Sequence, residues 1–323
     1  MSVGFDKDIF QACEDGDLDV VEWCLNHGTD VNILGSRGLK RGDKPIHTAL
    51  HYRRLEVFKL LLAQPDIHVN DYNKCGETLL TMITKNMFII NTRFKTCIFV
   101  KMFKLLLARQ DIDLDKANKN GQTPLYFASS LGHPKLAQWL LDAGANPNKA
   151  NQEDETPLLQ ASWNGHTKII QMLLDAGADV NKVSRVAWTP LVAACVYGLS
   201  TEAVQLLLSA GADPNKSTVY GETALYRAIV HRFGEERKVT VEIVLLLLRG
   251  GADPNQGTIW ADTPIDRALQ CGRTDIVEIL VPHIETLTDS YIDEYQGHLN
   301  IPSELRRNIS SFLTGRSLYK LNY

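Results

Sequence analysis

The feature of the sequence that most constrains its fold is a short phrase that returns along the chain. It reads TPLYFASSLGH from Thr123, TPLLQASWNGH from Thr156 and TPLVAACVYGL from Thr189, so that successive copies lie 33 residues apart. A fixed period of roughly 20 to 50 residues is the signature of a repeat architecture, in which each unit packs against its neighbours. Diverged copies of the phrase begin at Lys44, Thr78, Thr223 and Thr263.

A second phrase follows the first and completes the prediction of local structure. It reads LLDAGANPN up to Asn148 and LLDAGADVN up to Asn181, with further copies that end at Asn215 and Asn255. Thr-Pro predicts a helix start, because threonine can cap the helix and the N–H that proline lacks is unused in the first turn. The spaced leucines and alanines then form one apolar stripe, and Gly144 is typical of the end of a second short helix. We therefore predict pairs of short helices that must stack to bury their stripes, joined by polar β-turn loops that we call fingers.

The two phrases and their period resemble the ankyrin-repeat family over residues 5 to 284. The resemblance implies an all-α solenoid of about eight helix-turn-helix units with β-turn fingers, followed by a helical C-terminal tail. His47 matches the histidine of the family's TPLH motif, whose ring bonds to backbone, whereas Tyr126, Leu159, Val192, Tyr226 and Asp266 stand in that place elsewhere. We expect an N-terminal capping repeat at 1–32, repeats at 33–70, 71–115, 116–148, 149–181, 182–215, 216–255 and 256–284, and a tail or cap at 285–323.

Three segments interrupt the regular period. The finger between Asn32 and Pro45 is longer than the others, and the third and seventh copies carry extra residues at 86–100 and 231–240. These extra residues must lie within or between the paired helices. Insertions in repeat proteins usually map to loops and are candidate recognition elements. Simple growth of a surface loop is the alternative, because the entropy cost of closing a loop rises slowly with its length.

Large aromatic residues are concentrated in the fifth to eighth copies. In proteins of the ankyrin-repeat family, partners usually bind the concave side, which finger tips and first helices form. Exposed tryptophan and tyrosine dominate binding hot spots, and neighbouring Val186, Val219 and Ile259 would enlarge the patch. The alternative is that the rings seal neighbouring repeats, because aromatic side chains bury large areas. The candidate partner-binding residues are Trp188, Tyr220 and Trp260 on fingers, and Trp163 and Tyr197 near the ends of first helices.

The long finger after Asn32 is basic and rich in glycine, with the sequence GSRGLKRGDK. Its cations Arg37, Lys40 and Arg41 are further candidate partner-binding residues, because they would attract an acidic segment and speed association. A solvated loop is the alternative interpretation of such a run of charge.

The sequence after Ile284 leaves the repeat pattern. Pro302 and Ser303 predict a helix start, and Gly315 follows its predicted end. The simplest role of this segment is a cap that covers the apolar edge of the last repeat. A second hypothesis is a docking segment, since the phrase is faintly similar to the end of SOCS boxes and to F-box-like tails, which recruit ubiquitin-ligase subunits. That similarity rests on Ile301, Pro302, Leu305, Ile309 and Leu313, and the leucine-cysteine part of a SOCS box is absent.

The asparagines that flank the fingers raise the possibility of a modification. The family resemblance implies that Asn148, Asn181 and Asn215 are targets of asparaginyl hydroxylation. Their default role is structural, because asparagine tolerates turn geometry and bonds to nearby backbone.

Composition and motifs exclude several classes of function. The net charge of −4 gives no reason to expect a nucleic-acid-binding surface. The apolar stretch from Met87 to Ala108 is broken by charges that a membrane span would not tolerate. The six cysteines are scattered, which favours reduced thiols in the cytoplasm or nucleus, and the N-terminus has no long apolar signal segment. We find no phosphate loop, catalytic motif, metal motif or cofactor motif, and we attribute His133 and His166 to the repeat itself.

We therefore expect a non-catalytic, monomeric protein-interaction scaffold. The alternative is a substrate receptor of a ubiquitin ligase, in which the repeats hold the target and the tail holds the ligase. A third possibility is an effector or decoy that blocks another protein by binding alone.

Overall fold

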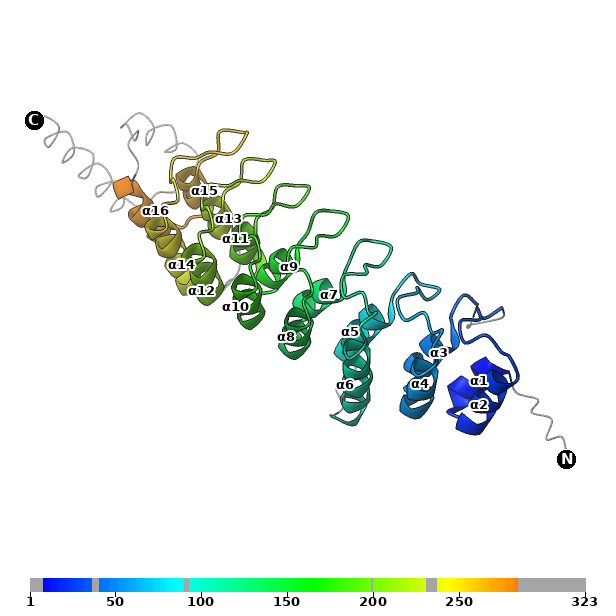
Figure 1. Cartoon of the computed structure of the whole chain (residues 1–323). Coiled ribbons are helices and arrows are strands. Elements are labelled where there is room, and N and C mark those ends of the chain that lie inside the picture. Colours follow the sequence, from blue (N-terminus) through cyan, green and yellow to red (C-terminus); the bar gives the residue numbers. More distant parts are fainter. Residues whose placement is uncertain (1–7, 37–40, 90–92, 199, 231–236, 284–323) are drawn as a thin grey trace, which may run out of the picture. The chain divides into compact units, whose positions relative to one another are not determined.

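A computed structural model describes residues 8–36, 41–89, 93–198, 200–230 and 237–283 (Figure 1). The chain divides into two compact units, residues 1–153 and residues 154–323. The first unit holds α1 (Ile9–Asp15), α2 (Leu18–Asn26), α3 (Pro45–His51), α4 (Leu55–Leu62), α5 (Leu79–Ile89), α6 (Arg93–Leu107), α7 (Pro124–Ser130) and α8 (Pro134–Asp142). The second holds α9 (Pro157–Trp163), α10 (Thr167–Asp175), α11 (Pro190–Ala193), the π-helical turn η2 (Ala194–Gly198), α12 (Thr201–Ser209), α13 (Ala224–Ile229), α14 (Arg237–Arg249), α15 (Pro264–Gln270), α16 (Thr274–Leu280) and the 3₁₀ turn η4 (Val281–His283).

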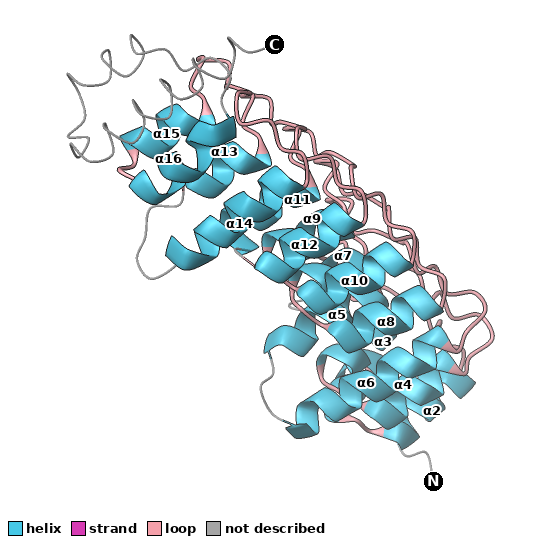
Figure 2. Cartoon of the chain, turned by 90° about the vertical axis from the view of Figure 1, so that its left-hand side faces the viewer, coloured by secondary structure: helices cyan, strands magenta, loops and turns pink. Residues whose placement is uncertain are grey.

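Within each unit the helices form two layers. Each odd-numbered helix pairs with the helix that follows it, and successive odd-numbered helices pack side by side, as α1, α3, α5 and α7 do in the first unit. In the second unit α10, α12, α14 and α16 form the other layer, and the loops of each unit lie along one side of the helices (Figure 2). The cores are leucine, isoleucine, valine and alanine from the predicted stripes, for example Leu158, Ile170 and Leu173, all at most 1% exposed. The expected all-α repeat fold is confirmed.

The helix starts follow the prediction from the Thr-Pro phrase. Thr123, Thr156, Thr189 and Thr223 each accept, through the side-chain oxygen, the N–H of the residue three positions later, at 3.1–3.2 Å. Gly144 has a φ of 97° after the end of α8, which is the left-handed conformation expected of a helix stop. The sequence therefore sets the boundaries of these helices locally.

His47 makes the bonds that its match to the TPLH motif implies. Its Nδ1 accepts the backbone N–H of Lys44 at 3.2 Å, and its Nε2 lies 3.3 Å from the carbonyl oxygen of Asp71. The side chain is buried, and this burial lowers the pKa of His47 to about 4. In the second unit Tyr226 occupies the equivalent place, and its hydroxyl donates to Asp262 Oδ2 at 2.6 Å. A phenol thus links the helix to the next finger where the histidine is missing.

The two insertions lengthen helices. Helix α6 has 15 residues and α14 has 13, whereas α8, α10 and α12 have nine each. The interpretation of the insertions as loop growth alone is therefore incomplete, although residues 90–92 and 231–236 lie outside the described part of the chain. Within the described ranges no helix combines the length and the apolar character that crossing a membrane requires.

Candidate functional site

The second unit carries three fingers, residues 182–188, 216–222 and 256–262, that precede α11, α13 and α15. Each is a tight β-turn, closed in the second finger by the N–H of Gly221 on the carbonyl of Thr218 at 2.9 Å. A buried hydroxyl organises each turn, and the Oγ1 of Thr258 accepts the N–H groups of both Trp260 and Asp262. The turn leaves the residues at each tip, such as Val219 and Tyr220 in the second finger, exposed to solvent.

Adjacent fingers of the second unit are joined by backbone hydrogen bonds. The N–H of Ile259 donates to the carbonyl of Tyr220 at 3.0 Å, and the N–H of Val219 donates to that of Val186 at 3.4 Å. These bonds bring the apolar tips together. We call the resulting surface the apolar finger patch, and it consists of Val186, Val219, Tyr220, Ile259 and Trp260.

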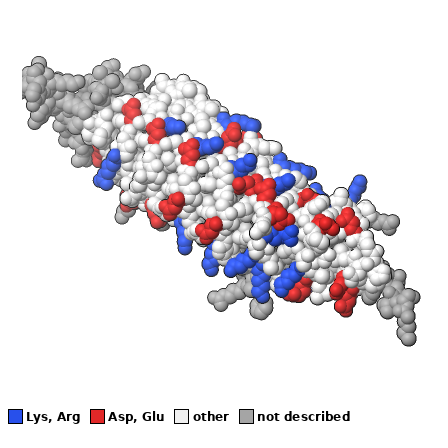
Figure 3. Space-filling view, viewed as in Figure 1, with Lys and Arg blue, Asp and Glu red and all other residues white. Residues whose placement is uncertain are grey.

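The apolar finger patch is exposed and ordered by stacked rings. The rings of Tyr220 and Trp260 lie 5.7 Å apart with an angle of 15° between their planes. Trp260 is 66% exposed and Tyr220 is 52% exposed, so the stack leaves most of both side chains accessible. The finger tips before α13 and α15 show mostly uncharged surface (Figure 3). Rigid aromatic side chains that lose little conformational entropy are the residues that dominate protein-binding hot spots.

The other two tryptophans among the candidate residues form a separate, less exposed pair. Trp163, the last residue of α9, lies 4.8 Å from Trp188 between ring centroids, and both side chains are half-buried. The guanidinium of Arg227 lies over the Trp188 ring at 5.4 Å. This half-buried pair is consistent with the alternative interpretation, in which the rings cover neighbouring repeats. Tyr220 and Trp260 at the finger tips are exposed, as binding requires. Tyr197 belongs to η2, and its side chain lies outside the described part.

Two arginines beside the patch were not singled out in the sequence. Arg227 and Arg267 occupy the same place in α13 and α15, four residues after Thr223 and Thr263. The guanidinium of Arg267 lies 5.6 Å from the Tyr226 ring. Burial and the hydrogen bond to Asp262 raise the pKa of Tyr226, so its phenol stays neutral. The repeat register was the signal that could have identified both arginines.

The basic finger is described only in part. Arg41 is exposed, and Gly42 donates its N–H to the carbonyl of Gly35 at 2.8 Å across the base of the finger. Arg37 and Lys40 lie outside the described residues, as does the whole tail after residue 283 with Ile301, Pro302, Leu305, Ile309 and Leu313. The roles predicted for these residues stay predictions.

The finger-flanking asparagines connect successive repeats. The Nδ2 of Asn181 donates to the carbonyl of Gly211 at 3.0 Å, and its Oδ1 accepts the N–H of Asp213 at 2.9 Å. Asn215 repeats both bonds with Gly251 and Asp253. The carboxamides of Asn181 and Asn215 thus have a structural role, but they bond the backbone of the following repeat and not, as predicted, backbone nearby in the sequence. Hydroxylation of Asn148, Asn181 and Asn215 stays a prediction.

Titratable groups in the described residues do not gather into a reactive cluster. Groups of three or more His, Cys, Asp or Glu side chains suited to a metal ion are absent from that part of the chain. His133 and His166 stand directly before α8 and α10, in the step between paired helices. Burial raises the pKa of the Cys195 thiol to about 12, which suppresses its thiolate.

Comparison with known proteins identifies the repeats. A family model described as "Ankyrin repeats (3 copies)" matches residues 96–184 and 182–258. A second, described as "Ankyrin repeats (many copies)", matches residues 9–62. A search of curated proteins found no match.

Proposed function

The chain belongs to the ankyrin-repeat family, and we propose that it binds a partner protein through the apolar finger patch of its second unit. Ankyrin repeats are in general protein–protein interaction modules, which supports a scaffold role. The observation that carries the proposal is the exposed Tyr220–Trp260 stack. A pair of aromatic side chains held in place and left in water is costly unless another surface covers it.

The proposed role is binding without chemistry. The patch is made of valine, isoleucine and aromatic side chains, and the phenol of Tyr220 is its one side-chain group that can exchange a proton. The expected scaffold is monomeric and acts in the cytoplasm or nucleus, which the free cysteines of the described residues support.

The test is a pair of alanine substitutions at the stack. Tyr220→Ala with Trp260→Ala is expected to weaken binding to a partner captured by the wild-type chain. Hot-spot aromatics contribute about 2 kcal/mol each, so the double variant should bind roughly a thousandfold more weakly. Affinity purification identifies the partner, and calorimetry with the purified pair measures the loss.

Tyr72 provides the matched control, because it is an exposed aromatic residue on a finger of the first unit. Tyr72→Ala should retain the affinity of the wild type. The far-ultraviolet circular dichroism of all variants should match, since the two rings of the stack are mostly outside the core. Normal binding by the double variant, or its unfolding, would remove the patch as the binding surface.

The tail is the basis of a second candidate function. Its similarity to docking segments of ubiquitin-ligase receptors favours a substrate-recognition adaptor, with the repeats holding the target. Purification of the full chain and of a chain truncated after Ile284 distinguishes the two functions. An adaptor loses cullin-type partners on truncation, whereas failure of both chains to capture any such partner rejects the adaptor.

Hydroxylation of Asn148, Asn181 and Asn215 is a further proposal from the family. Mass spectrometry of the native protein should show an added oxygen on these residues. Unmodified peptides throughout would leave the asparagines with their structural role alone.

A further inference from the structure

We propose that the partner segment bound by the apolar finger patch is acidic as well as apolar, with carboxylates on either side of the side chains that cover the Tyr220–Trp260 stack. This inference rests on the proposed function and names the chemistry of its partner. It follows from the distribution of charge around the patch.

The exposed charges of the three fingers are cationic. Lys182 begins the first finger and Lys216 begins the second, and both side chains are exposed. Arg185 stands exposed at the tip of the first finger, next to Val186. Within the described part of the chain, the ammonium of Lys216 bonds to a backbone carbonyl, that of Asn181 at 3.4 Å, and not to a carboxylate. Lys182 and Lys216 thus stand at the starts of the first two fingers, and Arg185 stands at the first tip beside the patch residue Val186.

The carboxylates of the same fingers are turned toward the helices. Glu222 accepts from the Arg227 guanidinium at 3.2 Å, and its side chain is 16% exposed. Asp262 accepts from the Tyr226 hydroxyl at 2.6 Å and from the Gln270 amide at 3.2 Å. Glu222 is thus paired with a cation and Asp262 is held by neutral donors within the unit, so the exposed charges of the fingers are those of Lys182, Arg185 and Lys216.

Arg267 adds a cation on α15, the helix that follows the third finger. Its Nη1 donates to the neutral oxygen of Gln270 at 3.0 Å, and among the described residues no salt bridge to it is formed. Its Nε is buried without a hydrogen-bond partner there. Arginine presents donors in a planar fork that suits a carboxylate, so Arg267 is available to an acidic side chain of the partner.

A partner with basic side chains would meet these cations as like charge. Complementary charge mainly raises the association rate and the specificity, while the apolar contacts supply most of the affinity. The surface therefore favours a segment in which leucine or phenylalanine residues alternate with aspartate or glutamate.

The experiment uses three fluorescent peptides of about a dozen residues with the full-length chain. All contain the same leucines and phenylalanines, and the intervening positions are glutamate, lysine or serine. We expect the glutamate peptide to bind roughly tenfold more tightly than the lysine peptide in low salt, with the difference shrinking as salt is added. Fluorescence anisotropy measures the affinities.

Charge reversal in the protein gives the second readout. Lys182→Glu with Lys216→Glu should lower the affinity for the glutamate peptide roughly tenfold and raise the affinity for the lysine peptide. Lys168→Glu is the control, because Lys168 is exposed on the outer helix α10 and away from the fingers. Arg267→Gln should weaken the glutamate peptide alone.

The acidic preference is overturned if the three peptides bind equally. It is also overturned if none of the three binds. If the peptides bind equally and Tyr220→Ala with Trp260→Ala abolishes their binding, the apolar patch stands while its acidic partner is rejected. Loss of the captured partner is measured separately, so the two proposals fail on different results.

Discussion

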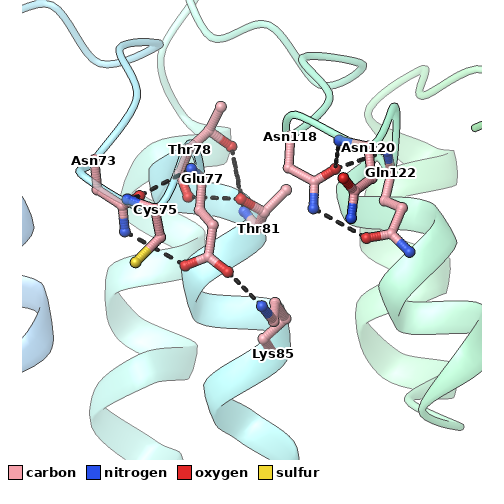
Figure 4. A network of polar contacts seen from close by, with 9 residues as sticks. All are labelled: Asn73, Cys75, Glu77, Thr78, Thr81, Lys85, Asn118, Asn120 and Gln122. Carbon is pink, nitrogen blue, oxygen red and sulfur yellow. Dashed lines mark hydrogen bonds and ion pairs between the residues drawn. The ribbon is translucent and has the colours of Figure 1, made fainter. Parts of the chain in front are cut away.

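The fingers of the two units have the same backbone turn and differ in the side chains that they expose to solvent. In the first unit, Asn73 organises a finger by accepting the N–H groups of Cys75 and Glu77 with one carboxamide oxygen, each at 2.9 Å. Asn118 does the same for Asn120 and Gln122 (Figure 4). In the second unit, buried Ser184, Thr218 and Thr258 stand at the same place in the repeat.

The tips beyond these anchors diverge in two of the three fingers of the second unit, while Arg185 keeps a cation at that place in the other. Lys74 pairs with Asp43 at 3.2 Å on one finger of the first unit, and Lys119 stands at the equivalent place on the next. In the second unit that place holds Val219 and Ile259. The comparison teaches that the turn is built by the anchor residue and the backbone, so the tip is free to change from polar to apolar without loss of the fold.

The last residue of each finger shows the same freedom. Glu77 binds Asn73 and Lys85 in the first unit (Figure 4), and Glu222 binds Arg227 in the second. Trp188 replaces the carboxylate in one finger, and its ring contacts that of Trp163 at an angle of 37°. Three predictions test how far the difference between the units extends.

The largest expected effect concerns pH and His47, which the second unit replaces with Tyr226. The folded pKa of His47 is about 4, below the ordinary value near 6.5, so between these values the unfolded chain takes up a proton that the folded chain excludes. Stability is therefore complete above this window and is lost as pH falls through it, by up to about 3 kcal/mol. Amide hydrogen exchange should show α3 and α5 opening in acid before α13 and α15.

The matched variant for this prediction is His47→Gln, which cannot be protonated. The substitution itself is expected to lower stability at neutral pH, so the readout is the change between pH 7 and pH 4.5. The variant should lose less stability over that interval than the wild type does. Identical losses would assign the acid sensitivity to other groups.

An intermediate effect is expected at Gly221, where the fingers of the second unit approach most closely. Gly221 has a φ of +78°, and a Cβ there would lie 3.0 Å from the backbone nitrogen of Ile259. Gly221→Ala combines a left-handed conformation with this clash, so it should destabilise by about 2 kcal/mol. Thermal denaturation measures the loss, and tryptophan fluorescence should report disturbance of Trp260.

Ala187 provides the opposite substitution at the same place in the repeat. It has a φ of 60° without the help of glycine, and the bond from Val219 to Val186 beside it is 3.4 Å long. Ala187→Gly should therefore stabilise by about 0.5–1 kcal/mol, because the left-handed conformation costs alanine more than glycine. A melting temperature lower than that of the wild type would show that this strain is absent.

The smallest effect is expected at Asp115, which interrupts the series of bridging asparagines in the first unit. Its carboxylate accepts the N–H of Asn146 at 3.0 Å but has no hydrogen to donate. Asn181 in the second unit both donates and accepts. Asp115→Asn should add the missing bond, to the carbonyl of Gly144 by the register of the repeat, and stabilise by about 0.5 kcal/mol.

Denaturant unfolding of the Asp115→Asn variant checks this value. Asn181→Asp is the reverse substitution and should destabilise by a similar amount. If both variants unfold at the wild-type concentration of denaturant, the carboxamide donor contributes nothing to the contact between repeats.

The helix pairs and their boundaries could be predicted because their determinants are local. Thr156 caps its own helix and Gly144 ends its own, so each residue acts within a few positions of the chain. The apolar positions were also predictable, since Leu158 and Ile170 belong to stripes with helical spacing. Because the same local pattern recurs in each repeat, every copy supported the prediction made for the others.

The candidate site was predicted only in part. Trp188, Tyr220 and Trp260 were identified together from their residue type, yet only Tyr220 and Trp260 are mostly exposed. Arg227 was missed, because its importance comes from its contact with the ring of Trp188, which is distant in sequence. Residue type indicates what a side chain can bind, and exposure depends on the neighbouring repeat.

The sequence by itself determined the repeat, the family and the position of every finger, because a period of 33 residues with local caps leaves few alternative folds. Only the tertiary structure decided which aromatic residues lie open, which carboxylates are occupied and which cations face solvent. The physical reason is that Tyr220 and Asp262 are each placed by bonds to a neighbouring repeat, which form only when the repeats stack.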